Sequence, residues 1–280
     1  MSLAELAARS GLHRVGARPP FWTYLRQTWE RRDFISAMAG SRLRASVESN
    51  RLGPLWLVLQ PLFNAAIYGT IFGLLQQGLR GEDYPARVMI GVFLWGFFAH
   101  SLTDGAKSIT GNQSLVQSLA FPRLTLPLAE VLEQFYALLP ALGLLAIILP
   151  FMGHPPSTEW LLMLPLLALF TLFNAGVAMI AARLTVHVRD LTQLLPFITR
   201  LLFYTSGVLF NVSRIFDQWP WVIRLYDFHP VYQVLQLARS VLMGIEVDSN
   251  YWLYFSIYAV VTFVVGLVFF WVAEERYGRD

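Results

Sequence analysis

Few residues in this 280-residue sequence form a pattern that is known to do chemistry. Lys107 is the only lysine and follows an alanine, so no GxxxxGK[ST] loop is present to cradle the phosphates of ATP. There is no GxSxG nucleophile elbow and no HExxH zinc motif. Cysteine is absent and the five histidines are scattered, which excludes a disulfide framework and a cysteine-based zinc site. We therefore expect no catalytic residue, metal or cofactor in this chain, although an integral-membrane glycosyl or acyl transferase that uses isolated carboxylates stays open.

Several charged side chains lie within long apolar runs, among them Arg200, Glu130 and Glu133. Arg200 is nine residues past Leu191, or about 13 Å along a helix, and a charge at that depth costs at least about 2.5 kcal/mol. We consider two roles for it. Arg200 faces a conduit or a subunit interface and meets a pyrophosphate head group, or it is structural, paired with Glu130 or Glu133 or extended to the cytoplasmic surface. The two glutamates share one helix face, which favours a polar contact between helices over the alternative, a proton relay.

The composition places these residues in a membrane protein. Hydrophobic residues make up 56% of the chain and charged residues 14%, with a mean hydropathy of +0.51. A soluble domain carries about 25% charged residues, so we predict an all-α polytopic membrane protein. The pI is 9.3, but 20 of the 21 basic residues are arginines spread between the apolar runs, which fits membrane topology better than nucleic-acid binding. The first 20 residues lack the apolar core of a cleaved signal peptide, and we expect none.

Six apolar segments are each close to the roughly 20 residues that cross about 30 Å of hydrocarbon. They are residues 55–76, 88–110, 126–150, 160–182, 191–210 and 251–273. If the N-terminus is cytoplasmic, the cytoplasmic segments hold fifteen arginine and lysine residues and the outer segments hold five. Because basic residues concentrate on the cytoplasmic side, we predict that both termini lie there.

The basic segment 29–52 precedes the first span and ends at a Gly-Pro pair. An apolar stripe recurs in it every four residues, at Ile35, Ala39, Leu43 and Val47. This spacing predicts an amphipathic interface helix that lies at the membrane surface with its arginines on lipid head groups. A simple membrane anchor is the plainer alternative.

The segment 211–250 is apolar and aromatic but is interrupted by Pro220 and by His229-Pro230. It is too long for a turn and too broken for a span. Non-helical backbone at membrane depth persists only where protein shields it or where it lines a cavity. We therefore predict a re-entrant or interfacial helix pair at the external face, between the fifth and sixth spans.

Aromatic residues make up 15% of the chain. Tryptophan and tyrosine near span ends normally form interfacial belts. Some rings could instead line a glycan path, because a flat ring can stack on a sugar face. Our candidates for a conduit are Phe98, Phe203, Tyr204 and Phe210, together with Arg200.

Four stretches resemble one known family. They are RDFISAMAGSRLRASVESNRLGPLWLVLQPLFNAAIYGTIFG, LWGFFAHSLTDGAKSITGNQSLVQSLAFPRLTLPLAEVL, VRDLTQLLPFITRLLFYTSGVLFNVSRI and HPVYQVLQLARSVLMG. In order and spacing they are similar to the permease subunits of type-2 ABC exporters of lipid-linked polysaccharide, the Wzm-like transporters of O-antigen, galactan or teichoic acid. The resemblance covers roughly residues 30 to 275. Residues 1–28 match nothing in that family.

The resemblance implies a homodimer in the bacterial cytoplasmic membrane, coupled to two copies of a separate ATPase chain. ATP and magnesium would belong to that partner, and the cargo would be a polyprenyl-pyrophosphate-linked polysaccharide such as O-antigen or galactan. Teichoic acid or another lipid is the alternative cargo on the same scaffold. The chain then divides into a cytoplasmic tail at 1–28, the interface helix at 29–52 and a type-2 ABC transmembrane domain at 53–280.

The resemblance also assigns roles to polar residues outside the spans. Residues 104–125 would hold a coupling helix that docks on the ATPase, where an ordinary cytoplasmic hairpin is the alternative. The coupling candidates are Asn112, Gln113, Ser114, Arg123, Arg189 and Asp190, of which the last two could also be positive-inside and helix N-cap residues. The interface helix would contact the ATPase and guard lateral entry of the lipid-linked substrate, through Arg31, Arg32, Arg42, Arg44 and Arg51.

Overall fold

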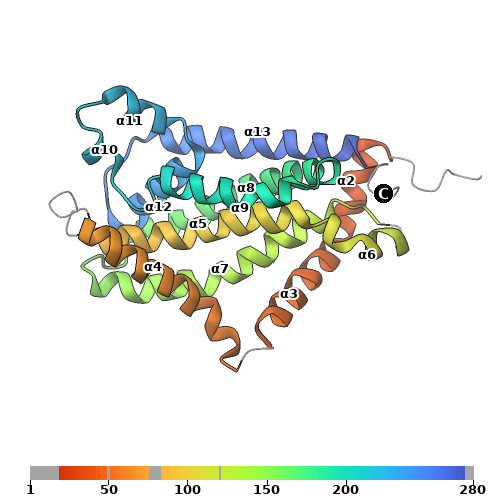
Figure 1. Cartoon of the computed structure of the whole chain (residues 1–280), viewed down its shortest axis with the longest axis horizontal. Helices are drawn as coiled ribbons and strands as arrows, with labels where there is room; N and C mark the ends of the chain where they lie inside the picture. Colours follow the sequence, from red (N-terminus) through yellow and green to blue (C-terminus); the bar gives the residue numbers. More distant parts are fainter. Residues whose placement is uncertain (1–18, 49–50, 76–82, 120, 275–280) are drawn as a thin grey trace, which may run out of the picture.

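A computed structural model describes residues 19–48, 51–75, 83–119 and 121–274, and the described residues are helical with no strand. Predictions for residues 1–18, Arg80, Arg276 and Arg279 lie outside this part of the chain. The long helices are α4 (Trp56–Leu75), α5 (Tyr84–Lys107), α7 (Thr125–Phe151), α8 (Met163–His187) and α13 (Asn250–Val272). The shorter helices are α2 (Phe21–Glu30), α3 (Arg32–Glu48), α6 (Gln113–Ser118), α9 (Leu191–Thr205), α10 (Val212–Ile215), α11 (Pro220–Asp227) and α12 (Pro230–Met243). Short 3-10 turns, η1 (Gly53–Leu55), η2 (Thr110–Asn112) and η3 (Thr158–Leu162), lead into α4, α6 and α8 (Figure 1).

Five described helices are long and apolar enough to cross a membrane. They are Gly53–Leu75, Tyr84–Lys107, Thr125–Phe151, Thr158–His187 and Asn250–Val272. They correspond to five of the six predicted spans, and the all-α polytopic fold is thereby confirmed. Their outward faces carry exposed apolar side chains such as Ile67, Ile147 and Val261, as a lipid-facing or subunit-facing surface requires.

The fifth predicted span, 191–210, is shorter in the structure than predicted. Its helix, α9, has 15 residues, or about 22 Å, and ends at Thr205. Beyond it the chain turns at Gly207, whose φ of 71° lies in the left-handed region that favours glycine. The non-helical residues that follow are buried, and side chains from other helices bind their carbonyl oxygens. Arg239 donates to Gly207 O and Val208 O at 3.0 Å, and Tyr84 donates to Leu209 O at 3.0 Å. The backbone can therefore leave the helix inside the protein without losing hydrogen bonds.

The predicted helix pair between the last two spans is confirmed. Proline begins both helices, at Pro220 for α11 and at Pro230 for α12, where its fixed φ suits the first turn. His229 caps α12, its Nδ1 accepting a hydrogen bond from the Tyr232 amide at 3.2 Å. Gly244, with a φ of 68°, ends the helix. α12 is buried on almost every side and packs against α5, α8 and α13, whereas α11 lies outside the bundle (Figure 1).

The closest helix contact joins α8 and α13. A Cβ atom on Gly266 would lie 2.5 Å from the Gly176 carbonyl oxygen, and one on Gly176 would lie 2.5 Å from the Thr262 backbone. Only glycine allows the two backbones to approach so closely, which is a common way for helices to pack in membranes.

The two ends of the described chain meet at one end of the bundle, beside α6 and opposite α10 and α11 (Figure 1). Tyr24 is fully buried, and its hydroxyl donates to the Glu274 carboxylate at 2.6 Å. The same carboxylate accepts the Arg123 amide at 3.1 Å, while the Arg123 guanidinium donates to the Glu274 backbone oxygen at 2.7 Å. Burial raises the pKa of Glu274, and the bonds from Tyr24 and Arg123 oppose that rise. This junction ties α2 and α13 to the start of α7.

Candidate functional site

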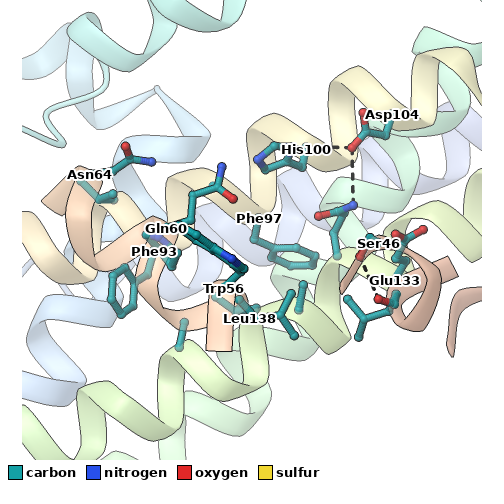
Figure 2. A pocket seen from close by; sticks show the side chains of 18 residues that line it. Ser46, Trp56, Gln60, Asn64, Phe93, Phe97, His100, Asp104, Glu133 and Leu138 are labelled. Atoms are coloured by element: carbon teal, nitrogen blue, oxygen red, sulfur yellow. Dashed lines mark hydrogen bonds and ion pairs between the residues drawn. The ribbon is translucent and has the colours of Figure 1, made fainter. Parts of the chain in front are cut away.

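A cavity of about 350 Å³ lies between α3, α4, α5 and α7 (Figure 2). Its volume is at the low end of the range for small-molecule sites. Aromatic rings and polar groups share its lining, among them Trp56, Gln60, Asn64, Phe93, His100 and Glu133.

One wall comes from α4, the first span. Trp56, Gln60 and Asn64 follow one another at intervals of four residues, so a single face of the helix presents all three to the cavity (Figure 2). Within the described residues, no hydrogen bond involves either amide side chain. Gln60 and Asn64 are thus available to a ligand, at a depth where a polar group without a partner is costly.

The opposite wall, from α5 and α7, carries carboxylates. His100 Nδ1 lies 3.6 Å from Asp104 Oδ2, and Gln134 Nε2 donates to the same oxygen at 3.4 Å (Figure 2). Glu133 also lines the cavity. No arginine or lysine is among its described lining residues, and its acidic groups are Asp104 and Glu133.

Arg42 of α3 lies behind this wall and binds two other segments. Its guanidinium forms an ion pair with the Glu130 carboxylate of α7, and its second nitrogen donates to Asn112 Oδ1 at 3.0 Å. Burial lowers the pKa of Arg42 below its ordinary value, against the opposing field of Glu133. The predicted stripe of α3 faces the same way, with Ile35, Ala39 and Val47 buried and α3 packed along α7. The interface helix is therefore held by protein contacts on its apolar side.

The pairing of Glu130 with Arg42 answers part of the question about Arg200. Glu130 is bound from α3, and within the described residues no ion pair joins Arg200 to either glutamate. Within the described residues, the pairing of Arg200 with a glutamate that we considered is therefore not seen. Arg200 instead lies on the exposed side of α9, beside Phe197 and Leu201, which are 69% and 65% exposed.

The predicted coupling residues fall into three places. Asn112, Gln113 and Ser114 lie at the start of α6; Gln113 and Ser114 are exposed, and Asn112 is bound by Arg42 and to the Ser108 carbonyl at 2.7 Å. Arg123 is held by Glu274 in the junction of the chain ends. Arg189 and Asp190 are exposed between α8 and α9. Asp190 occupies the N-cap position of α9, but its side chain makes no capping hydrogen bond.

The remaining predicted residues separate into exposed and buried sets. Arg31, Arg32, Arg44 and Arg51 are exposed, as head-group contacts require, whereas Arg42 is half-buried. Phe98 and Phe203 are core residues, 4% and 7% exposed, in an aromatic cluster with Trp95. Tyr204 is exposed and Phe210 is half-buried. Of the aromatic conduit candidates, only Tyr204 presents an open face.

The sequence reasoning missed the polar residues of the cavity. Gln60 and Asn64 lie in a run that carries no charge, and two uncharged amides leave its mean hydropathy high. Their spacing of four residues was the available signal, because it places both on one face of the first span. His100 and Asp104 show the same spacing in the second span.

The fold and the site together define a class. The chain is an all-α, multi-pass membrane protein with a polar cavity beside its first span. It belongs to the ABC-2 type transporter family, whose family model matches residues 35–243, more than half of the chain. The predicted membership among permease subunits of this transporter type is confirmed, and the chain is a transport subunit.

Relatives of the chain align along most of its length. It is 28% identical over 250 residues to an O-antigen export system permease protein, RfbA, of Klebsiella pneumoniae, covering 88% of this chain and 94% of the relative. A Myxococcus xanthus protein of the same name is 25% identical, covering 69% of this chain and 74% of the relative. The polysialic acid transport protein KpsM of Escherichia coli is 22% identical, covering 86% and 93%.

Proposed function

We propose that this chain is the transmembrane subunit of an ATP-driven exporter that moves a polyprenyl-pyrophosphate-linked polysaccharide, of the O-antigen or galactan type, across the bacterial cytoplasmic membrane. The observation that carries the proposal is the likeness to O-antigen export permeases over 88% of this chain and 94% of the relative. The likeness to a polysialic acid transport protein favours a second cargo, an acidic polysaccharide.

In this proposal the chain supplies the path, and separate ATPase chains supply the energy. Two copies of the permease and two of the ATPase form the transporter, with ATP and magnesium bound by the ATPase. The exposed Gln113 and Ser114 at the start of α6, with Arg189 and Asp190, contact the ATPase. Both ends of the described part of the chain lie on the same side as this contact, and the proposal places that side in the cytoplasm.

Arg42 connects the proposed ATPase contact to the substrate path. It binds Asn112, at the start of the coupling segment, and Glu130 of α7 from a position on α3. A displacement of the coupling segment therefore reaches α3 and the mouth of the cavity through one side chain. This arrangement suits a gate that opens when the ATPase changes state.

In this proposal, a second permease copy packs against the apolar surface of α9. α9 makes few contacts within the chain and exposes Leu194, Phe197 and Leu201. Arg200 lies on the same side, so a second copy would bring it toward the subunit interface. This arrangement supports the conduit role of Arg200.

Deletion of the gene tests the proposal. We expect a lipid-linked glycan to accumulate in the cytoplasmic leaflet, where mass spectrometry of the extracted lipid identifies the polymer. Affinity purification of the permease should bring down an ATPase subunit with measurable ATP hydrolysis. If no ATPase associates and no lipid-linked glycan accumulates, the exporter proposal fails and a membrane transferase is favoured.

A further inference from the structure

We propose that the cavity between α3, α4, α5 and α7 binds an uncharged sugar ring of the cargo and excludes its pyrophosphate. This inference rests on the proposed function and deepens it, by assigning one part of the substrate to a pocket within a single subunit. Three features of the lining support it: the amides of α4, the carboxylates of α5 and α7, and the aromatic rings between them (Figure 2).

The amides give the first argument. Gln60 lies about 10 Å and Asn64 about 16 Å along the helix from Gly53, where the first span begins. At these depths an amide without a partner is costly, and polar side chains inside a membrane protein usually serve a function. Each amide offers two donors and an acceptor, which matches a hydroxyl group that both donates and accepts. Neighbouring hydroxyls of a sugar can therefore satisfy both amides at once.

The charges of the cavity give the second argument. Asp104 and Glu133 line it, and its described lining holds no arginine or lysine. Arg42, behind the wall, is bound to Glu130 and Asn112. A pyrophosphate placed here would face carboxylates across a medium that screens charge poorly. Sugar hydroxyls, by contrast, can donate hydrogen bonds to those same carboxylates.

The aromatic rings give the third argument. Trp56 stands at the mouth of the cavity, and Phe93 and Phe97 form part of its inner wall (Figure 2). Small-molecule sites commonly combine apolar surface with a few polar groups that fix orientation. A pyranose ring has an apolar C–H face for the rings and hydroxyls on its edge for Gln60 and Asn64.

A second copy of α4 is the competing occupant, because amides also join helices across membrane interfaces. The geometry argues for a ligand. Gln60 and Asn64 line a hollow whose other walls belong to the same chain, together with His100 and Glu133.

The test uses the permease purified with its ATPase in lipid nanodiscs free of glycoside detergents. Saturation-transfer difference NMR measures binding of methyl α-D-mannopyranoside, methyl β-D-galactopyranoside and methyl α-L-rhamnopyranoside, with inorganic pyrophosphate as competitor. The variants are Asn64→Leu and Gln60→Leu, each close in shape to the native residue. Thr70→Val is the matched control, since Thr70 is an exposed residue of α4 that does not line the cavity.

We expect at least one glycoside to bind, and pyrophosphate not to displace it. Loss of one amide should weaken binding about fivefold or more, as removing a hydrogen-bonding partner does, while the control binds as the native protein does. Absence of glycoside binding, displacement by pyrophosphate, or equal binding by the native protein and both leucine variants would overturn the inference. So would loss of the permease dimer in the leucine variants. Accumulation of a lipid-linked glycan in the deletion strain tests the proposed function separately. A negative result in the glycoside-binding experiment would therefore overturn the pocket inference and leave the exporter proposal standing.

Discussion

The guanidinium of Arg42, on the interface helix, is paired with the carboxylate of Glu130, on the third long helix, across 88 positions of sequence. Their side chains are 22% and 11% exposed, so the pair is largely removed from water. The second nitrogen of the same guanidinium holds Asn112. One side chain of α3 thus contacts both α7 and the turn that precedes α6.

Truncating this arginine should destabilise the protein more than removing both partners. Arg42→Ala leaves the Glu130 carboxylate buried without a cation, at a cost of about 3 kcal/mol. Arg42→Ala combined with Glu130→Gln should recover much of that loss, because no charge is then stranded. Thermal unfolding of the four proteins gives the coupling energy. Arg44→Ala, at an exposed position of the same helix, should change stability by less than about 0.5 kcal/mol. Additive effects of the two changes would show that the pair does not act as a unit.

Replacing Arg200 should affect transport and leave assembly unchanged. Within the described residues this guanidinium has no ion pair, so Arg200→Ala removes no internal contact. We expect the variant to assemble with its ATPase and to lose export, measured as surface polysaccharide. Gln193→Ala, another exposed position on α9, should export normally. An unstable, unassembled Arg200→Ala protein would assign the arginine a structural role.

Arg239 should be needed to stabilise the non-helical backbone that follows α9. It is 2% exposed and donates to the carbonyls of Arg87, Gly207 and Val208. Arg239→Leu removes a buried charge but leaves these acceptors without a donor, and each costs about 1 to 3 kcal/mol. We expect a lower unfolding temperature and faster proteolysis near residue 207.

The control for this prediction is Arg224→Leu, at an exposed position of α11. It should unfold at nearly the native temperature. Equal or greater stability of Arg239→Leu would mean that the desolvation of the guanidinium outweighs its three hydrogen bonds.

A methyl group between α8 and α13 should be poorly tolerated. Gly266→Ala places a Cβ atom 2.5 Å from the Gly176 carbonyl oxygen, so the two helices must separate. Overpacking of this kind costs about 1 to 3 kcal/mol. Gly143→Ala, on α7, is the matched control, because its Cβ atom meets nothing within 4 Å. We expect the control to unfold at or above the native temperature, and equal melting of the two variants would refute the close contact.

Acid should weaken the start of α12 through His229. Its Nδ1 accepts the Tyr232 amide only when that nitrogen carries no proton. Burial lowers the pKa of His229 below its ordinary value of 6.5. A group whose pKa is lowered by folding contributes stability above its unfolded pKa and loses it as pH falls through the folded pKa. Stability should therefore decline below about pH 6.5, by about 1 kcal/mol for the lost cap.

Unfolding temperature measured against pH, for the native protein and His229→Asn, checks this prediction. Asparagine also caps helices but does not titrate, so the variant should show a shallower decline in acid. Because the other titratable groups are common to both proteins, their contributions cancel in the difference. Parallel curves would show that His229 is not the group responsible.

Local features of the sequence were enough to predict most of the fold. Apolar length sets five of the spans, because hydrocarbon thickness is matched by the residues of one continuous segment. Pro220 and Pro230 mark the helix pair, because proline restricts its own backbone whatever surrounds it. The stripe of Ile35, Ala39 and Val47 identifies the buried face of α3, because residues at helical spacing share one side of the helix.

Contacts between distant segments determined where α9 ends, which residue pairs with Glu130 and where the cavity forms. α9 can stop early because Arg239, more than thirty positions further on, donates hydrogen bonds to the carbonyl oxygens of the residues that follow the helix. Glu130 is bound by Arg42 rather than Arg200, and the cavity exists only where four helices meet. Hydropathy and proline act within a few residues and can be read along the chain. Hydrogen-bond partners and cavity walls depend on how helices pack, so the sequence alone determined the membrane architecture and the tertiary structure decided the site.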